Sequence, residues 1–308
     1  MAAIERIVVV TRKTALEELV QRMNSWAQAR FYLEQNQVAF SEYEQADAQY
    51  RRAVDFVRQH LPSTVKQHFI DRDFLPTYQF RERDLVVTIG PDGLVINTAK
   101  YLTTQPILAL NPDPQRIDGV LIPFHYKQVL SVVEQAARGR SEIRHVSMVK
   151  ATLNDGQRLY AINDLFIGQR SHTSARYLLQ LGEQHEAQIS SGIIVSTGAG
   201  STGWLRSIVQ GAWAIASPQG HEQVLPVAPW DADTLWYTVR EPFVSKVSQV
   251  NIVFGQLKPG QELVITSQMP DNGVIFSDGI ESDYLAFHSG LIARVGLAER
   301  KAHFVAAQ

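Results

Sequence analysis

The chain has 308 residues, which is enough for about two domains of ordinary size. Hydrophobic residues make up 45% and charged residues 19%, so wholesale disorder is excluded. The 29 basic and 31 acidic side chains leave a net charge of -2, and this balance favours neither nucleic acid nor a membrane as a partner. Cysteine is absent, which excludes disulfides, thiolate catalysis and cysteine–zinc sites and fits a cytoplasmic location.

The first 89 residues contain no glycine and predict a small α/β domain. Apolar residues at helical spacing, such as Leu16, Leu19 and Met23, alternate there with short β-like runs. Residues 85–89 and 106–110 are continuous apolar runs, as in a parallel sheet covered on both faces. The expected elements are strands over 7–10, 65–70, 85–89 and 106–110 and helices over about 14–34, 41–60 and 94–102.

After about residue 121 the pattern changes to short β-rich runs separated by Asp-Gly, Asn-Asp and Pro-Gly turns. This spacing predicts a largely antiparallel, β-sandwich-like second domain. The expected strands lie over 143–149, 159–162, 249–254, 262–266 and 274–276.

The turn from Gly90 to Gly93 is the first candidate site. It follows a buried strand and precedes a predicted helix, so its backbone N–H groups would face a phosphate at a positive helix end. Asp92, within this turn, could act as a base toward a hydroxyl or coordinate a metal. Pro-Asp-Gly is also a common turn sequence, so the loop alone does not establish a site.

A second candidate runs from Ile193 to Trp204, where Gly198, Gly200 and Gly203 satisfy G-x-G-x-x-G between a strand and a helix. About 20 residues further on, the sequence reads S-P-Q-G-H-E at 217–222, without the strand-end acid that a Rossmann site needs. The pattern therefore predicts nucleotide contact without hydride transfer. The Asn163–Asp164 pair, flanked by apolar residues, is the third candidate and also fits a simple turn.

Taken in order, these three segments resemble the ATP-dependent NAD kinase family, part of a superfamily with diacylglycerol and sphingosine kinases. That family carries a G-G-D-G loop, then an Asn-Glu pair, then a hydroxyl- and glycine-rich loop in a β-rich domain. The mitochondrial-type branch is the most similar, through the 111–116 and 239–243 segments, Trp204 and residues 287–305. The resemblance covers nearly the whole chain from about residue 84.

The resemblance implies a three-layer α/β domain over 1–121, a β-rich NAD-binding domain over 122–291, and a C-terminal segment from about 292 to 308 that returns to the first domain. It also implies that Asp92 is the catalytic base on the 2′-hydroxyl of the adenosine ribose of NAD. The implied phosphate- or ATP-binding residues are Gly90, Gly93 and Asn111. The implied NAD-binding residues are Asn163, Asp164, Thr197, Gly200, Ser201, Thr202, Gly203 and Trp204.

As further implications, Mg²⁺ would accompany ATP without a metal site fixed by protein ligands alone, and the chain would form a homodimer or homotetramer. Asp278-Gly279 matches a later Asp-Gly turn of the family, to which we assign a structural role.

The sequence departs from the family pattern at Pro91, which replaces the second glycine of G-G-D-G, and at Leu94, which replaces a threonine. Proline removes one backbone donor, and a hydrogen bond to a charged group is worth roughly 1.5–3 kcal/mol. Two functions from different classes therefore stay open. One is an NAD kinase; the other is an NAD-binding sensor or regulator whose phosphate loop has lost catalysis. A dehydrogenase is a distant third.

Overall fold

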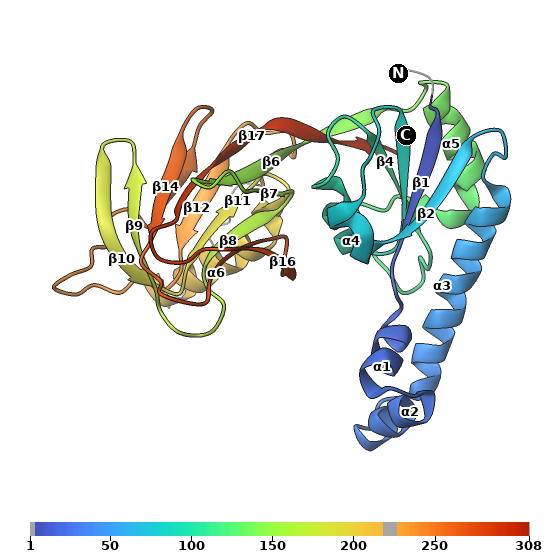
Figure 1. The fold of residues 1–308 in the computed structure, drawn as a ribbon, viewed down its shortest axis with the longest axis horizontal. Helices are drawn as coiled ribbons and strands as arrows, with labels where there is room; N and C mark the ends of the chain where they lie inside the picture. The colour runs from blue at the N-terminus through green and yellow to red at the C-terminus, as the bar shows by residue number, and fades with distance from the viewer. Residues whose placement is uncertain (1–3, 218–226, 308) are drawn as a thin grey trace. The chain divides into compact units, whose positions relative to one another are not determined.

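The computed structural model describes residues 4–217 and 227–307, and these divide into two compact units. Unit 1 comprises Met1–Arg144 with His303–Gln308, and unit 2 comprises His145–Ala302 (Figure 1). The sequence analysis placed these boundaries at 121 and about 292. The structure moves the first boundary because α5 (Val129–Ala137) packs into the core of unit 1 through Val129, Val132, Val133 and Ala136.

Unit 1 is built on the predicted parallel sheet, with strand order β2-β1-β3-β4. Strands β1, β3 and β4 are buried almost throughout, which is why their sequences are largely continuous apolar runs. The edge strand β2 is exposed to half-buried and has a more polar sequence. Helices α3 and α5 contribute to one core with this sheet, and α4 contacts β3 and β4 outside that core (Figure 1). The strands are β1 (Arg6–Thr11), β2 (Lys66–Asp71), β3 (Asp84–Ile89), β4 (Pro106–Asn111) and β5 (Phe124–His125).

The last residues of the described chain return to this sheet, as the resemblance implied. β17 (Ile292–Val305) pairs in parallel with β4 through His303 and Phe304, and Val305 lies in the core of unit 1. The return therefore completes the sheet of unit 1 on the far side of β4.

The prediction of one helix over 14–34 was wrong. The structure has α1 (Ala15–Met23) and α2 (Trp26–Gln35), separated by Asn24 in the left-handed conformation with φ 59°. Ser25 then caps α2 with its hydroxyl. The two helices close a small apolar core against the start of α3 (Phe40–His60).

The helix predicted over 94–102 is α4 (Asp92–Ala99), which starts two residues earlier. Two short 3-10 helices complete unit 1, η1 (Arg72–Thr77) and η2 (Tyr126–Gln128).

Unit 2 is a β-sandwich, as predicted, with both sheets contributing to one buried core. One sheet has the order β10-β9-β14-β17 with β6 and β7; the other has the order β13-β12-β11-β8-β15-β16. The strands of the first sheet are β6 (Ile143–Leu153), β7 (Arg158–Ala161), β9 (Ala175–Leu181), β10 (Gln184–Ser190) and β14 (Glu262–Ser267). Those of the second are β8 (Asp164–Gln169), β11 (Ile193–Ser196), β12 (Leu235–Val239), β13 (Phe254–Leu257), β15 (Gly273–Ser277) and β16 (Ile280–Ala286).

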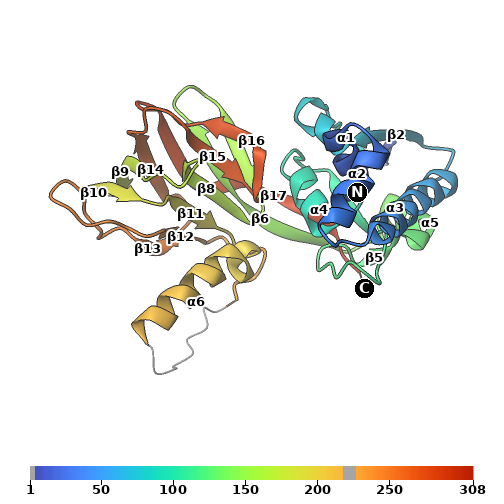
Figure 2. The same cartoon turned by 90° about the horizontal axis from the view of Figure 1, so that it is seen from below.

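The strand predicted over 249–254 was wrong except for its last residue, because β13 begins at Phe254. The backbone N–H groups of Asn251 and Ile252 donate instead to the buried carboxylate of Glu186. On the second sheet, α6 (Trp204–Ala216) packs through Trp204 and Ile208 (Figure 2). No helix in the described part of the chain is long and apolar enough to span a membrane.

Candidate functional site

The candidate residues fall into two groups, one in each unit. In unit 1, Asp92 is the first residue of α4, directly after the turn that ends β3. It is half-buried, and burial raises the pKa of its carboxyl while backbone N–H groups of Leu121 and Val120 lower it. A raised pKa makes a carboxylate a stronger base as long as it stays ionised at the working pH.

Pro91 is the N-cap residue of α4, and its carbonyl accepts the N–H of Leu94 at 2.9 Å. At Gly90 a Cβ would come within 2.9 Å of the Leu94 side chain, so the turn leaves little room for a larger residue. Gly93 is exposed, and a Cβ there would meet nothing within 4 Å. Of these two glycines, only Gly90 is required by close packing.

Asn111, implied as an ATP contact, is buried at the end of β4. Its amide donates to the Ile117 carbonyl at 2.9 Å and its oxygen accepts the Asp113 N–H at 2.9 Å. The side chain therefore braces the 111–117 loop within unit 1.

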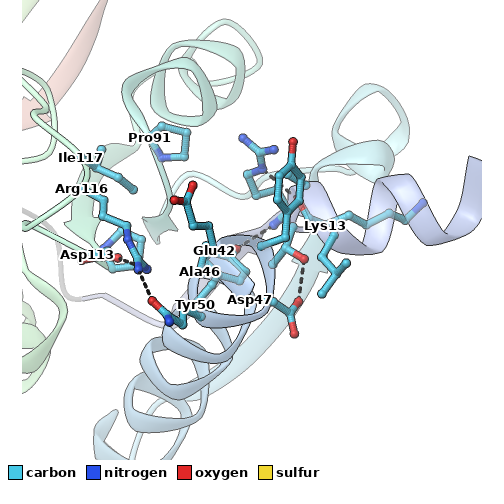
Figure 3. A pocket seen from close by; sticks show the side chains of 16 residues that line it. Lys13, Glu42, Ala46, Asp47, Tyr50, Pro91, Asp113, Arg116 and Ile117 are labelled. Atoms are coloured by element: carbon cyan, nitrogen blue, oxygen red, sulfur yellow. Dashed lines mark hydrogen bonds and ion pairs between the residues drawn. The ribbon is translucent and has the colours of Figure 1, made fainter. Parts of the chain in front are cut away.

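A cavity of about 670 Å³ lies at the carboxyl end of this sheet and was missed by the sequence analysis (Figure 3). This volume lies in the usual range of small-molecule sites, and the carboxyl edge of an open parallel sheet is where ligands bind. Pro91 and Ile117 line one side, and Glu42 and Ala46 of α3 line another. Because Pro91 lines it, the cavity borders the loop that carries Asp92. Its cationic lining residues are Arg12, Lys13 and Arg116.

Tyr50 of α3 ties two strand ends together beside this cavity. Its hydroxyl accepts the N–H of Arg12 at 2.9 Å and donates to the carbonyl of Ile89 at 3.0 Å. Burial raises the pKa of the phenol to about 12, so it stays protonated as a donor. Ile89 is the last residue before the Gly90 turn, so Tyr50 fixes the start of the candidate phosphate loop.

In unit 2 the structure brings the second and third candidates together. The Thr197 N–H donates to the Asn163 carbonyl at 2.9 Å, and the Thr197 hydroxyl donates to the carbonyl of Ile162. A Cβ at Gly200 would lie 2.3 Å from the Asn163 carbonyl oxygen, so glycine is needed for this close backbone approach.

Asp278 completes this cluster. Its carboxylate accepts the backbone N–H groups of Ile162, Asn163 and Asp164 at 3.1, 2.7 and 3.3 Å. The side chain therefore holds the turn that carries the candidate pair, which is the structural role that we assigned to the Asp-Gly turn.

Asp164 is the most perturbed acid of the cluster. Its side chain is 9% exposed, and Oδ1 has no hydrogen-bond partner within the described part of the chain. Burial raises the pKa of its carboxyl to about 7, and the charge of Asp278 adds to the rise while Ser196 opposes it. A buried acid with a raised pKa and an unpartnered oxygen is a candidate for contact with a ligand.

The remaining candidates divide into framework and accessible residues. Thr197, Gly200 and Ser201 are buried, and the Ser201 hydroxyl donates to the Gly198 carbonyl at 2.7 Å. Thr202 and Gly203 are exposed. Trp204 is half-buried and stacks on Phe166 with ring centroids 5.9 Å apart.

The topology around the G-x-G-x-x-G segment differs from a Rossmann unit. β11, which precedes it, pairs antiparallel with both β8 and β12. A Rossmann site needs parallel neighbours, so this segment is not one. Residues 218–222 of the sequence argument lie outside the described residues.

Within residues 4–217 and 227–307, no group of three or more acidic or histidine side chains could hold a metal ion.

The two units, an α/β unit and a β-sandwich, together have the fold that is found in NAD kinases. The chain has this fold in common with an NAD kinase from Archaeoglobus fulgidus in complex with ATP (TM-score 0.57, 15% identity, 98% of this chain and 93% of that one). The chain also shares this fold with yeast NADH kinase complexed with NADH (TM-score 0.59, 15% identity, 100% of this chain and 85% of that one).

Curated relatives are similar in sequence to this chain. A protein of Oryza sativa subsp. japonica named "Probable NADH kinase" is 26% identical over 223 residues, 64% of this chain and 63% of that protein. The NAD kinase of Prosthecochloris aestuarii is 27% identical over 154 residues, 48% of this chain and 52% of the enzyme. The chain thus spans between half and two thirds of the length of these relatives. No family model matches it.

Proposed function

We propose that the chain is an NAD kinase that transfers the γ-phosphoryl group of ATP to the 2′-hydroxyl of the adenosine ribose of NAD, giving NADP and ADP. The observation that carries this proposal is the position of Asp92, a half-buried carboxylate in the first turn of α4. It directly follows Pro91, which lines a ligand-sized cavity. The relatives named NAD or NADH kinase and the shared fold support it.

In the proposed reaction Asp92 accepts the proton of the ribose hydroxyl as that oxygen attacks the γ-phosphorus. The bond between the γ-phosphorus and the oxygen bridging to the β-phosphorus breaks, and ADP leaves. General-base catalysis of this kind typically contributes about 10²–10⁴-fold. Mg²⁺ would enter with ATP and neutralise its phosphates.

The proposed acceptor site lies in unit 2. Asn163, Asp164, Thr202, Gly203 and Trp204 would contact the dinucleotide. Behind them the buried residues Thr197, Gly200 and Ser201 would hold the loop in shape, with Asp278 fixing the turn.

The proposed donor site lies in unit 1. The N–H groups of the first turn of α4 would face the ATP phosphates with Gly90 and Gly93, and the 670 Å³ cavity would receive the rest of the nucleotide. Asn111 would act here through the loop that it braces.

The same resemblance leads us to propose a cytoplasmic homodimer or homotetramer. Light scattering after size exclusion would measure the oligomeric state, and a monomer would contradict that part of the proposal.

The experiment that tests the activity is a coupled assay with NAD, ATP and Mg²⁺, in which an NADP-specific dehydrogenase reports the product. NADH and polyphosphate replace NAD and ATP in parallel reactions. Asp92→Asn should lose most of the turnover, by about 10²–10⁴-fold, and bind NAD within a few-fold of the parent. Full activity of the variant would exclude Asp92 as the base.

A second candidate function is favoured by one observation. Pro91, at the N-cap of α4, has no N–H to offer a phosphate. If the parent binds NAD in calorimetry and makes no NADP, the chain is an NAD sensor or regulator. If NAD does not bind up to millimolar concentration, both functions are excluded.

A further inference from the structure

The carboxylate of Asp92 is held by a turn that no part of the sequence argument had singled out. Its Oδ2 accepts the backbone N–H of Val120 and its Oδ1 accepts that of Leu121, both at 3.1 Å. This turn lies between β4 and β5, about 28 residues from Asp92 along the chain. Each carboxylate oxygen therefore has one backbone donor.

Gly119, at the start of the turn, is close to the same carboxylate. A Cβ at this position would lie 2.9 Å from Asp92 Oδ1 and 1.9 Å from the nearest atom of Ile122. Its φ is not in the left-handed region, so glycine is needed here for space and not for its conformational freedom. A larger residue would push the turn away from Asp92.

Charged side chains on the elements that pack against α4 are engaged elsewhere. Asp84 of β3 is paired with Arg6, and Arg72 and Asp73 of η1 lie in ion pairs with residues of the first helix and the segment before it. Burial raises the pKa of Asp92, and the two N–H groups are the interactions that oppose it. The turn is thus the source of the local stabilisation of the ionised form.

We infer that the turn Gly119–Leu121 is the positioning element of the proposed general base. The inference rests on the proposed function, because it assigns a role in that reaction. The two N–H groups fix the plane of the carboxylate and keep it ionised, and each oxygen retains a lone pair for the ribose hydroxyl. The positioning groups are the backbone N–H groups at 120 and 121, which act through Asp92; the side chain at position 120 has no part in this role.

The test compares Val120→Pro with Val120→Ala. Val120 is 74% exposed, so both variants change a side chain at the surface, and only proline also removes the N–H that Asp92 accepts. The readout is the pH profile of NADP formation. Losing one donor to a charged group should shift the acidic limb of Val120→Pro to higher pH, with about tenfold less activity at the acidic end.

Val120→Ala should keep the parent's profile. A Val120→Pro profile equal to that of Val120→Ala would overturn the inference. So would a uniform loss at every pH, because that is the result of a merely structural role.

A second measurement does not depend on activity. NMR titration of protein labelled with ¹³C-aspartate, with Asp92→Asn to assign the signal, follows the Asp92 carboxyl directly. The midpoint should be higher in Val120→Pro than in Val120→Ala, and equal midpoints would overturn the inference.

If Val120→Pro does not fold, an ester in place of the Leu121 amide removes the other donor without a ring, and the same shift is expected. If the parent makes no NADP, the proposed function fails while the titration still decides the role of the turn.

Discussion

Asp164 gives the prediction with the largest expected pH dependence. Its carboxyl is buried with a pKa of about 7, against 3.8 for an unperturbed aspartate. The folded protein therefore holds a proton on this group up to about pH 7, whereas the unfolded chain releases it near pH 4. Between these two values the folded state binds more protons, so the free energy of unfolding falls as the pH rises, and it levels off above pH 7.

The substitution Asp164→Asn removes this titration. Two pH units separate pH 5 from the folded pKa, and each unit is worth about 1.4 kcal/mol. The stability of the variant relative to the parent should therefore rise by about 3 kcal/mol between pH 5 and pH 8.

Urea unfolding at pH 5, 6, 7 and 8 measures this difference. Asp271→Asn is the matched control, since Asp271 is an exposed aspartate of the same unit. The difference in stability between the Asp271→Asn variant and the parent should change little between pH 5 and pH 8. A difference between Asp164→Asn and the parent that is constant with pH, or that falls as the pH rises, would refute the assignment of a raised pKa.

Three further predictions concern other parts of the two groups. Pro91→Gly restores a backbone donor and should raise the transfer rate or the apparent ATP affinity by about one to two decades. NAD affinity should stay unchanged, and stability should fall by about 0.4–1 kcal/mol. An equal rate in the folded variant would show that the donor is not needed. Gly200→Ala should cost about 1–3 kcal/mol in urea unfolding and weaken NAD binding in calorimetry, because its Cβ meets a backbone carbonyl 2.3 Å away. The control Gly211→Ala, in an open part of α6, should be neutral or stabilising. Tyr50→Phe removes the hydroxyl that joins the ends of β1 and β3, so the variant should lose about 1–2 kcal/mol of stability in urea unfolding. An unchanged unfolding midpoint would contradict that role.

The centre of the sheet of unit 1 could be predicted because β1, β3 and β4 are buried on both faces and so leave largely apolar runs in the sequence. The break at Asn24 was missed although Asn-Ser is a recognisable helix end and helix start, since apolar spacing continues across it. Helix α5 was also missed, yet its four buried residues at positions 129, 132, 133 and 136 have helical spacing. The change in turn composition near residue 121 led the sequence analysis to place the domain boundary there, before this helix.

The candidate site could be predicted only in part. The segments 163–164 and 197–204 are local patterns, and the structure places the first of them against Thr197 and Gly200. The turn that holds Asp92 and the cavity beside Pro91 could not be found in this way. Both join segments that lie far apart in the chain. The turn also contacts Asp92 through backbone N–H groups, which every residue except proline possesses.

The path of the chain between the two units makes unit 2 an insertion within unit 1. The chain leaves unit 1 at Arg144 and re-enters it at His303, and the two connections are neighbours there, since the Ala306 N–H donates to the Glu142 carbonyl at 3.0 Å. A short linker from residue 144 to residue 303 would therefore make unit 1 a continuous chain with every strand of its sheet retained. The insertion point is thus a natural place to exchange unit 2 for another domain while the Gly90 turn keeps the strands and the helix that hold it.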